Sequence, residues 1–431
     1  MLDANLLRLR QCVKDIQFTL VSQDPGYSRE LYGADAVEPI GFLAEGSASD
    51  RANLARLQLA IEAARCKADG SKTTEEDLAI NRIVDAIYAS DGVLISGGGN
   101  LSSTWPQHIF ERVAVIQIAR ILGKRIAVSG QTIGPNLSVA HLELIRDTLP
   151  SVDFLGAREL DTFERSLQLG LPVGRLEYHV DDAMHLPGEP YEPAANLSQP
   201  FVAVTLHAFS SESDEDRALH SLAQQLEQIA DYTKLRLVFI PHLRKVPGSK
   251  RFSDLRIGRK LADFMEEPDR MTVMDVGTGR RVAWLTRQAS MVISSRYHPL
   301  VFGLGGAVPS LGLFTDEYTR VKLQGALEHA DLQRWSMSMS SALSGALFET
   351  AKEMWDSHAE IRGGLAAYIE MWAALDDQYV QKMVEALGLT FAGADRYGQD
   401  SALTPEYRTS ILAAGTWRSA ADTPSTEVNR I

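Results

Sequence analysis

The sequence predicts an α/β protein with two parallel-sheet domains and a group of C-terminal helices. Short β-branched runs alternate with helical stretches in two successive series, a pattern typical of parallel strands joined by helical crossovers. A stretch rich in Pro, Glu, Ala and Ser, residues 188–200, separates the two series and fits an interdomain linker. From residue 341 to 387, apolar side chains recur at spacings of three and four, which predicts helices.

These patterns divide the chain into five parts. We predict a Rossmann-like domain over residues 1–187, the linker over 188–200, and a second Rossmann-like domain over 201–330 whose last strand covers 308–314. Helices follow over residues 331–388, with a break at Gly363-Gly364, and residues 389–431 form a polar tail.

The composition is that of an ordinary globular protein with an acidic balance. The 431 residues carry a net charge of −13, which argues against a surface that binds nucleic acid. The two cysteines, Cys12 and Cys66, have no metal-binding spacing and favour a reducing, cytoplasmic setting. No apolar run reaches the length of a membrane span, so we expect a soluble protein.

The stretch from residue 291 to 300 is the first candidate site. A short apolar run, typical of a buried strand, leads into Ser295, Arg296 and His298, and Pro299 fits the first turn of a helix. Open parallel sheets bind ligands at such strand-to-helix turns, where free N–H groups favour anions. We therefore predict a site for a small anion with His298 as proton donor. The alternative is that Arg296 pairs with a surface carboxylate and His298 packs under a loop.

Three earlier strand ends carry further candidates. Glycines allow a sharp turn and the close approach of a ligand, so their N–H groups are candidates to bind phosphate or sugar oxygens. The triple glycine matches neither of the common phosphate-binding fingerprints, and a tight strand-to-helix turn is the alternative. The candidates are Gly97, Gly98, Gly99 and Asn100 at the first strand end, Gly130 and Gln131 at the second, and Arg158 at the third.

Four blocks, in this order, resemble the polysaccharide pyruvyl transferase family. They are the triple-glycine strand end, residues 94–100; residues 130–135, close to the family's G-Q-x-I-G-P; Arg158-Glu159 with residues 167–170 downstream; and the Arg-x-His of Arg296 and His298. The turn at residues 181–183 resembles the family's D-P-A, and Asp254 resembles an acidic residue of its second domain. The resemblance covers roughly residues 3–326.

The resemblance implies a GT-B-like arrangement of the two Rossmann-like domains, with the site in the cleft. It also implies the reaction. The enolpyruvyl group of phosphoenolpyruvate passes to two hydroxyls of a sugar in a surface-polysaccharide or glycolipid precursor, forms a pyruvate ketal there, and releases phosphate. Phosphoenolpyruvate is then a co-substrate, and no nicotinamide, flavin or other cofactor is expected.

This donor carries a carboxylate and a phosphate, which call for two fixed cations. Arg158 and Arg296 would each bind one of them bidentately. His298 would protonate the enol carbon or assist the departure of phosphate. Asp3 and Asp254 are the candidates for the base that activates the acceptor hydroxyl.

The sequence departs from the family in two places. The family begins with a strand and a G-D loop, whereas this chain starts near the matching Asp3. Either the true start lies upstream, or the first domain has lost its first strand. Some members carry a lysine after the last strand of the second domain. Here that region is acidic apart from Arg320, so Arg320 or Lys322 would replace it.

Two other functions stay open from the sequence. A nucleotide-sugar glycosyltransferase would share the two-domain plan, and a non-catalytic anion-binding relative would tolerate both departures. The acceptor is a sugar or a lipid-linked glycan, and peripheral membrane association and a homo-oligomer are left open.

Overall fold

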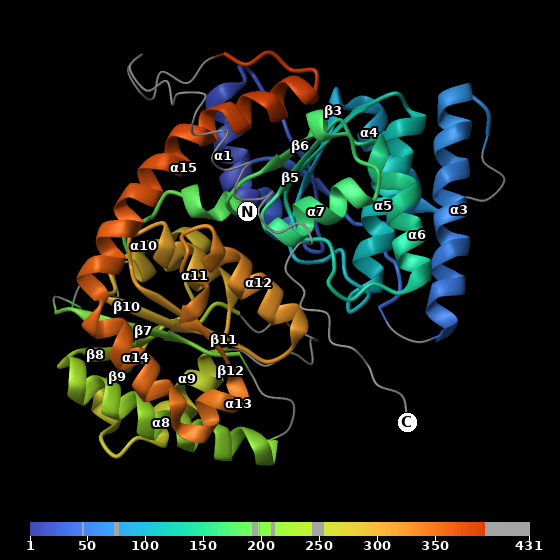
Figure 1. The fold of residues 1–431 in the computed structure, drawn as a ribbon. Helices are drawn as coiled ribbons and strands as arrows, with labels where there is room; N and C mark the ends of the chain where they lie inside the picture. The colour runs from blue at the N-terminus through green and yellow to red at the C-terminus, as the bar shows by residue number, and fades with distance from the viewer. Residues whose placement is uncertain are drawn as a thin grey trace, which may run out of the picture. The chain divides into compact units, whose positions relative to one another are not determined.

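Two separate parallel sheets organise the chain (Figure 1). A computed structural model describes residues 1–44, 47–72, 77–191, 197, 199–207, 212–243 and 254–392. Part of the predicted linker, residues 192–196 and 198, and the predicted tail from residue 393 onward lie outside these ranges.

The first sheet has four parallel strands in the order β3-β4-β5-β6. Its strands are β3 (Gly92–Ser96), β4 (Arg125–Gln131), β5 (Phe154–Ala157) and β6 (Leu176–Tyr178), and the helices between and before them are α4 (Leu78–Ala89), α5 (Pro106–Ile121), α6 (Val139–Thr148) and α7 (Leu160–Gln168). A capping residue or a proline marks the start of α4, α5 and α6. Asp77, for example, accepts the N–H groups of Ala79 and Ile80 at the first turn of α4. Ile83, Ile109 and Phe110 are buried in the core of this half.

A small sheet of two parallel strands precedes the first one. Its strands are β1 (Thr19–Val21) and β2 (Asp35–Val37), and the helices of this region are α1 (Leu2–Cys12), α2 (Pro25–Tyr32) and α3 (Ser47–Asp69). Asp24 caps α2 and Pro25 opens it, so a sequence that suggests only a turn starts a helix here. Among the described residues, β3 is one of the two edge strands of the four-stranded sheet.

The second sheet has six parallel strands in the order β12-β11-β10-β7-β8-β9. Its strands are β7 (Phe201–Thr205), β8 (Arg236–Phe239), β9 (Met271–Val273), β10 (Met291–Ser294), β11 (Ser310–Phe314) and β12 (Ser336–Ser338), with the helices α8 (Glu212–Thr233), α9 (Asp254–Asp263), α10 (Gly279–Arg287), α11 (Tyr297–Leu304) and α12 (Glu317–Glu328). β10 lies inside the sheet between β7 and β11, and all four of its residues are buried. The Arg-x-His turn therefore starts from a rigid, buried strand.

Two predictions about the C-terminal part are wrong. The strand over residues 308–314 is not the last, because β12 adds to β11 at the sheet edge. The helix is not broken at Gly363-Gly364 either. It breaks at Ser357, between α14 (Leu347–Asp356) and α15 (His358–Ala386). Buried Ile361 and Leu365 hold the helix on both sides of the glycine pair, so packing overrides the low helix propensity of glycine.

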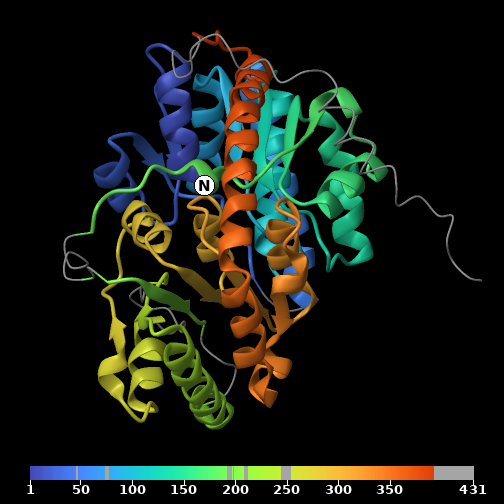
Figure 2. The same ribbon diagram turned by 60° about the vertical axis from the view of Figure 1, so that its left-hand side comes forward.

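The long helix α15 joins the two halves (Figure 2). It follows the short helix α13 (Met339–Ser341), a π-helical turn over Ala342–Ala346, and α14, which packs on α8 beside the second sheet. Its first half shares a core with the second sheet, whereas Tyr379, Val380 and Met383 in its second half pack with Leu9 of α1 and Phe154 of β5. None of the described helices has the length and apolar character needed to cross a bilayer.

Candidate active site

The carboxyl ends of β3 and β5 meet the region of α11 and α12 in the second half of the chain. Tyr318 on α12 donates its hydroxyl to the carbonyl oxygen of Gly99. The guanidinium carbon of Arg158 lies 4.3 Å from the centre of the Tyr297 ring, and His329 Nε2 donates to the carbonyl oxygen of Arg158 at 2.8 Å. These contacts bring residues from distant parts of the sequence into one site.

Arg158 lies at the centre of this site and is 1% exposed. Its Nε donates to Thr132 Oγ1 at 2.8 Å and to Glu159 at 2.9 Å, and its Nη1 donates to Asp181 at 2.6 Å. Within the described chain, Nη2 is buried and has no hydrogen-bond partner. Because carboxylates occupy two of the three nitrogens, a bound anion would find one free nitrogen rather than the bidentate fork that we predicted.

Asp181 completes this cluster, although we did not select it as a site residue. One of its carboxylate oxygens accepts from Arg158 and the other accepts from the backbone N–H of Ala183 at 2.8 Å. Burial opposes its ionisation, but the Arg158 charge outweighs this effect and holds the pKa of Asp181 at about 2. The only sequence signal was the likeness of residues 181–183 to the family's D-P-A turn.

His298 lies in the first turn of α11, and its ring stacks on Phe302. Its Nε2 is buried and lacks a hydrogen-bond partner among the described residues. Burial lowers the pKa of His298 to about 3, although Asp181 opposes the shift. We had assigned His298 as a proton donor because free histidine titrates near neutral pH. Desolvation makes it a neutral imidazole in the empty site.

Lys322 is the second cation of the site. Its Nζ lies 5.2 Å from the centre of the Tyr297 ring and 4.8 Å from that of Tyr318. Burial, reinforced by the charge of Arg158, lowers the pKa of Lys322 to about 8. The sequence offered Lys322 only as an alternative to Arg320.

Arg320 makes its contacts within α12 itself. Its guanidinium binds Glu317 at 2.7 and 2.5 Å and Gln324 at 2.6 Å, and its side chain is 40% exposed. Lys322 thus shares the Tyr297 ring with Arg158, whereas Arg320 is paired within its own helix.

The triple glycine is required by close packing of the chain. A Cβ at Gly97 would lie 2.3 Å from the carbonyl oxygen of Ser129, and one at Gly99 would lie 2.7 Å from Cε of Lys322. The carbonyl oxygen of Gly98 accepts from Gln131 Nε2 at 2.6 Å. Gly97 thus fits the tight-turn interpretation, whereas Gly99 places its backbone beside the Lys322 amine.

Gly130 adopts a left-handed conformation, with φ +64°. A Cβ there would lie 2.7 Å from a carboxylate oxygen of Asp182 and 2.4 Å from Cε of Met1, whose sulfur accepts from Arg158 Nη1 at 3.4 Å. The Met1 side chain thus fills the space between Gly130 and Arg158. Nearby, the side-chain oxygens of Asn100 and Gln131 are buried, and no partner for them lies among the described residues.

Arg296 and Asp254 form a pair. Arg296 donates to the two carboxylate oxygens of Asp254 at 2.7 and 2.5 Å, and Asp254 also accepts the backbone N–H groups of residues 242 and 243 at 3.0 and 2.9 Å. The alternative reading of Arg296, a carboxylate partner, therefore describes its contacts, although Asp254 is buried rather than at the surface. Ser295 Oγ accepts the backbone N–H of His207 at 2.9 Å.

Neither candidate base is unengaged. The oxygens of Asp254 already accept four hydrogen bonds, and Asp3 forms a bidentate pair with Arg280 at 2.8 Å for both contacts.

The chain has a GT-B-like α/β fold, as solved structures of similar architecture show. They include a UDP-N-acetylglucosamine 2-epimerase with a TM-score of 0.54 and 10% identity, covering 94% of this chain and 95% of that one. The Anabaena protein HepE in complex with UDP-glucose gives 0.52 and 9%, covering 89% and 94%, and the UDP-GlcNAc 2-epimerase from Neisseria meningitidis bound to UDP-GlcNAc gives 0.51 and 12%, covering 89% and 96%. At such low identity, the likeness concerns the fold alone.

The sequence itself defines the family. The family model for polysaccharide pyruvyl transferases matches residues 1–316. The chain belongs to the polysaccharide pyruvyl transferase family. No curated protein matches it in sequence.

Proposed function

We propose that this transferase moves the enolpyruvyl group of phosphoenolpyruvate onto two hydroxyls of a sugar in a surface-polysaccharide or glycolipid precursor. The proposal rests on one observation above all. Arg158 Nη2 and His298 Nε2 are buried without partners in the described chain, and the Arg158 guanidinium and the Lys322 amine both lie over the Tyr297 ring. Buried polar atoms without partners are rare in folded proteins, and a polar ligand would satisfy them.

The donor carries both a phosphate and a carboxylate, and Arg158 and Lys322 would bind these two anionic groups. Arg158 Nη2 offers hydrogen bonds in a fixed direction, while Lys322 offers a compact charge on a flexible stem. Arg296 keeps its place through Asp254, so Lys322 replaces it in our proposal as the second cation. A donor bound to Arg158 would displace the Met1 side chain, which contacts Nη1.

The loaded site would also change the state of His298. Burial keeps its imidazole neutral in the empty site, and a donor with a phosphate dianion would favour the protonated form. His298 would then deliver the proton to the methylene carbon of the donor, which gives an oxocarbenium-like centre at C2.

The overall chemistry balances without a cofactor. The methylene carbon gains one proton, two sugar hydroxyls bond to C2 and lose their protons, and the bond from C2 to the phosphate oxygen breaks. Of the two protons released, one replaces the proton added to carbon and the other leaves on the phosphate.

The test is incubation of the full chain with phosphoenolpyruvate and a panel of galactosides. We expect phosphate release that depends on the sugar, together with a ketal methyl signal in the NMR spectrum of the product. His298→Gln should lower turnover more than donor affinity, whereas Lys322→Met should weaken affinity. Lys352→Met is a matched control, because Lys352 also lies over a tyrosine ring, 5.5 Å from that of Tyr232.

The same assay separates the other two functions. Transfer from UDP-sugars without reaction of phosphoenolpyruvate would indicate a glycosyltransferase. Calorimetric binding of phosphoenolpyruvate without phosphate release, over the whole panel, would indicate an anion-binding relative.

A further inference from the structure

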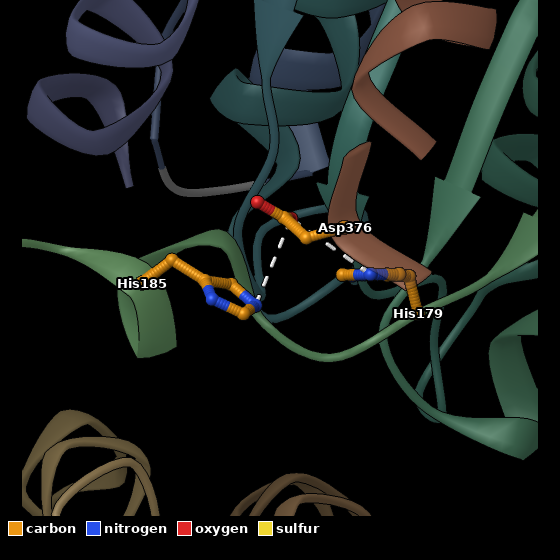
Figure 3. A group of neighbouring side chains, drawn as sticks. All are labelled: His179, His185 and Asp376. Atoms are coloured by element: carbon orange, nitrogen blue, oxygen red, sulfur yellow. Dashed lines mark ion pairs between the residues drawn. The ribbon is translucent and has the colours of Figure 1, made fainter. Parts of the chain in front are cut away.

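Two histidines and an aspartate meet where the segment after β6 faces α15, and the proposed reaction uses none of them (Figure 3). His179 follows β6, His185 ends the short 3-10 helix η3 (Asp182–His185), and Asp376 comes from α15. One donor atom from each residue lies within 4.8 Å of the others, and no ion is present in the structure.

The contacts among these three residues are too long for hydrogen bonds. Nε2 of His179 lies 3.8 Å from Oδ1 of Asp376, and Nε2 of His185 lies 3.6 Å from the same oxygen. Both Nε2 atoms are buried and have no hydrogen-bond partner in the described part of the chain. Two desolvated ring nitrogens that face a carboxylate at this distance, without a hydrogen bond, indicate that a bound cation would satisfy them.

The tautomer of His179 favours a metal ion over a proton. Its Nδ1 lies 3.2 Å from the carbonyl oxygen of Val180, so Nδ1 carries the hydrogen and Nε2 presents its lone pair. The ring is fixed by stacking on Tyr379, with centroids 4.2 Å apart, and by the edge of Trp372. Neutral imidazole is the form that binds metals.

The spacing of the donors fits a small metal ion. In a tetrahedral site with bonds of about 2.0–2.1 Å, neighbouring donor atoms lie about 3.4 Å apart. The observed 3.6 and 3.8 Å to Asp376 exceed this by a few tenths of an ångström, and the donor atoms of the two histidines lie within 4.8 Å of each other, so side-chain rotation would have to close the site.

We propose that His179, His185 and Asp376 bind one divalent first-row transition-metal ion, of the Zn²⁺ and Fe²⁺ kind. Two imidazoles and one carboxylate are typical ligands of such ions, whereas Mg²⁺ and Ca²⁺ prefer oxygen alone. Water would complete the coordination. The ligands are scattered over about 200 residues of the sequence, so no spacing motif could reveal them.

Arg8 is the outer partner of this site. It donates to Asp376 Oδ1 at 2.5 Å and to Asp182 Oδ1 at 3.1 Å. The first bond orients the carboxylate, as second-shell groups do at metal sites. The Asp182 carboxylate offsets the charge of Arg8, and the second lone pair of Oδ1 remains for the metal.

The position of the site suggests a structural role. His179 and His185 flank the turn that carries Asp181, which in turn holds Arg158. A metal shared with Asp376 would tie this turn to α15. The ion would thus act as a positioning element for Arg158, at a distance from the reacting atoms.

Metal binding is measured on the full chain, purified without a histidine tag and stripped with a chelator. Co²⁺ is added as a spectroscopic probe and Zn²⁺ as a competitor, and bound metal is counted after desalting. We expect one ion per chain, Co²⁺ absorption bands typical of nitrogen and oxygen ligands, and a higher midpoint of thermal unfolding with metal.

His185→Gln and Asp376→Asn should each weaken Co²⁺ binding by more than about 100-fold, because outer-shell changes alone cost about 10–100-fold. The matched control is His220→Gln, which removes an exposed histidine on α8. Folded wild-type protein without Co²⁺ bands, or a His185→Gln protein that binds like wild type, would refute the metal site. These readouts do not involve phosphoenolpyruvate, so a metal-loaded chain without turnover would overturn the proposed function instead.

Discussion

Replacement of Lys322 by Met tests the proposed donor site most directly. The substitution keeps an apolar stem of similar length and removes the amine that lies over the Tyr297 and Tyr318 rings. Two unit charges about 4 Å apart at an effective dielectric constant of about 20 attract by about 4 kcal/mol. Desolvation offsets part of this, and a charge-assisted hydrogen bond contributes about 1.5–3 kcal/mol net. We therefore expect donor affinity to fall by roughly 10–100-fold.

Calorimetric titration with phosphoenolpyruvate measures this loss, and its pH dependence identifies the group. Lys322 faces Arg158, Glu159, Asp181 and Asp316, and the pKa of its amine is about 8 in the empty site. Above that pH the ammonium population falls about tenfold per unit, while the donor phosphate, with a second pKa of about 6, stays dianionic. The dissociation constant should therefore rise with pH in wild type and less steeply in Lys322→Met, which keeps every other titrating group.

Two outcomes would refute this reasoning. One is equal donor affinity in Lys322→Met and wild type at pH 7. The other is an equal slope of affinity against pH in both proteins. Lys352→Met should match wild type in both measurements, and circular dichroism confirms that each variant is folded.

Three further predictions concern the same site. Asp181→Asn leaves the buried Arg158 with one ionic partner fewer, so the free energy of unfolding in urea should drop by about 3–5 kcal/mol; a drop below about 1 kcal/mol would contradict the ion-pair assignment. Gly99→Ala places a methyl group 2.7 Å from Cε of Lys322, so donor affinity should fall while the unfolding midpoint changes little, and an unchanged affinity would show that this loop does not border the donor. Burial lowers the pKa of His298 from about 6.5 in the unfolded chain to about 3 in the folded one. The charges of the N-terminal amine, Arg158 and Lys322 add to this shift, and Asp181 opposes it. The unfolded state thus takes up its proton first as pH falls below about 6.5, and stability is lost by about 1.4 kcal/mol per pH unit. His298→Gln should remove that part of the slope in denaturant titrations between pH 6.5 and 4, and an unchanged slope would show that the folded imidazole already carries a proton.

The alternation of strands and helices was readable from the sequence because both sheets are parallel and buried. Their strands are short apolar runs, such as Met291–Ser294, and the helices between them have regular apolar faces. The miss at β12 has a simple cause. Ser336–Ser338 is a three-residue edge strand with half-buried side chains, so its sequence carries neither an apolar run nor a clear alternation.

The site residues at strand ends were also accessible, since parallel strands bring their carboxyl ends to one edge. Arg158 and His298 follow strands of different sheets, and they were placed in one site because the two domains were expected to face each other across a cleft and because the resemblance implies one donor. In the structure, Arg158 packs over Tyr297, the neighbour of His298. The side-chain partners of these residues could not be predicted from the sequence. The pairing of Arg296 with Asp254 depends on the fold of a segment more than forty positions away, and the low pKa of His298 depends on burial that no local pattern encodes.

The path of α15 should make the two halves of the chain unfold together. Its residues Tyr379, Val380 and Met383 cover apolar side chains of α1 and β5, although the helix starts in the core of the other sheet. A chain cut after residue 330 lacks α15 and would expose that apolar surface to water, so this fragment should aggregate. Heating the intact chain should accordingly give one calorimetric peak for residues 1–392, because neither sheet keeps its apolar cover once the other has melted.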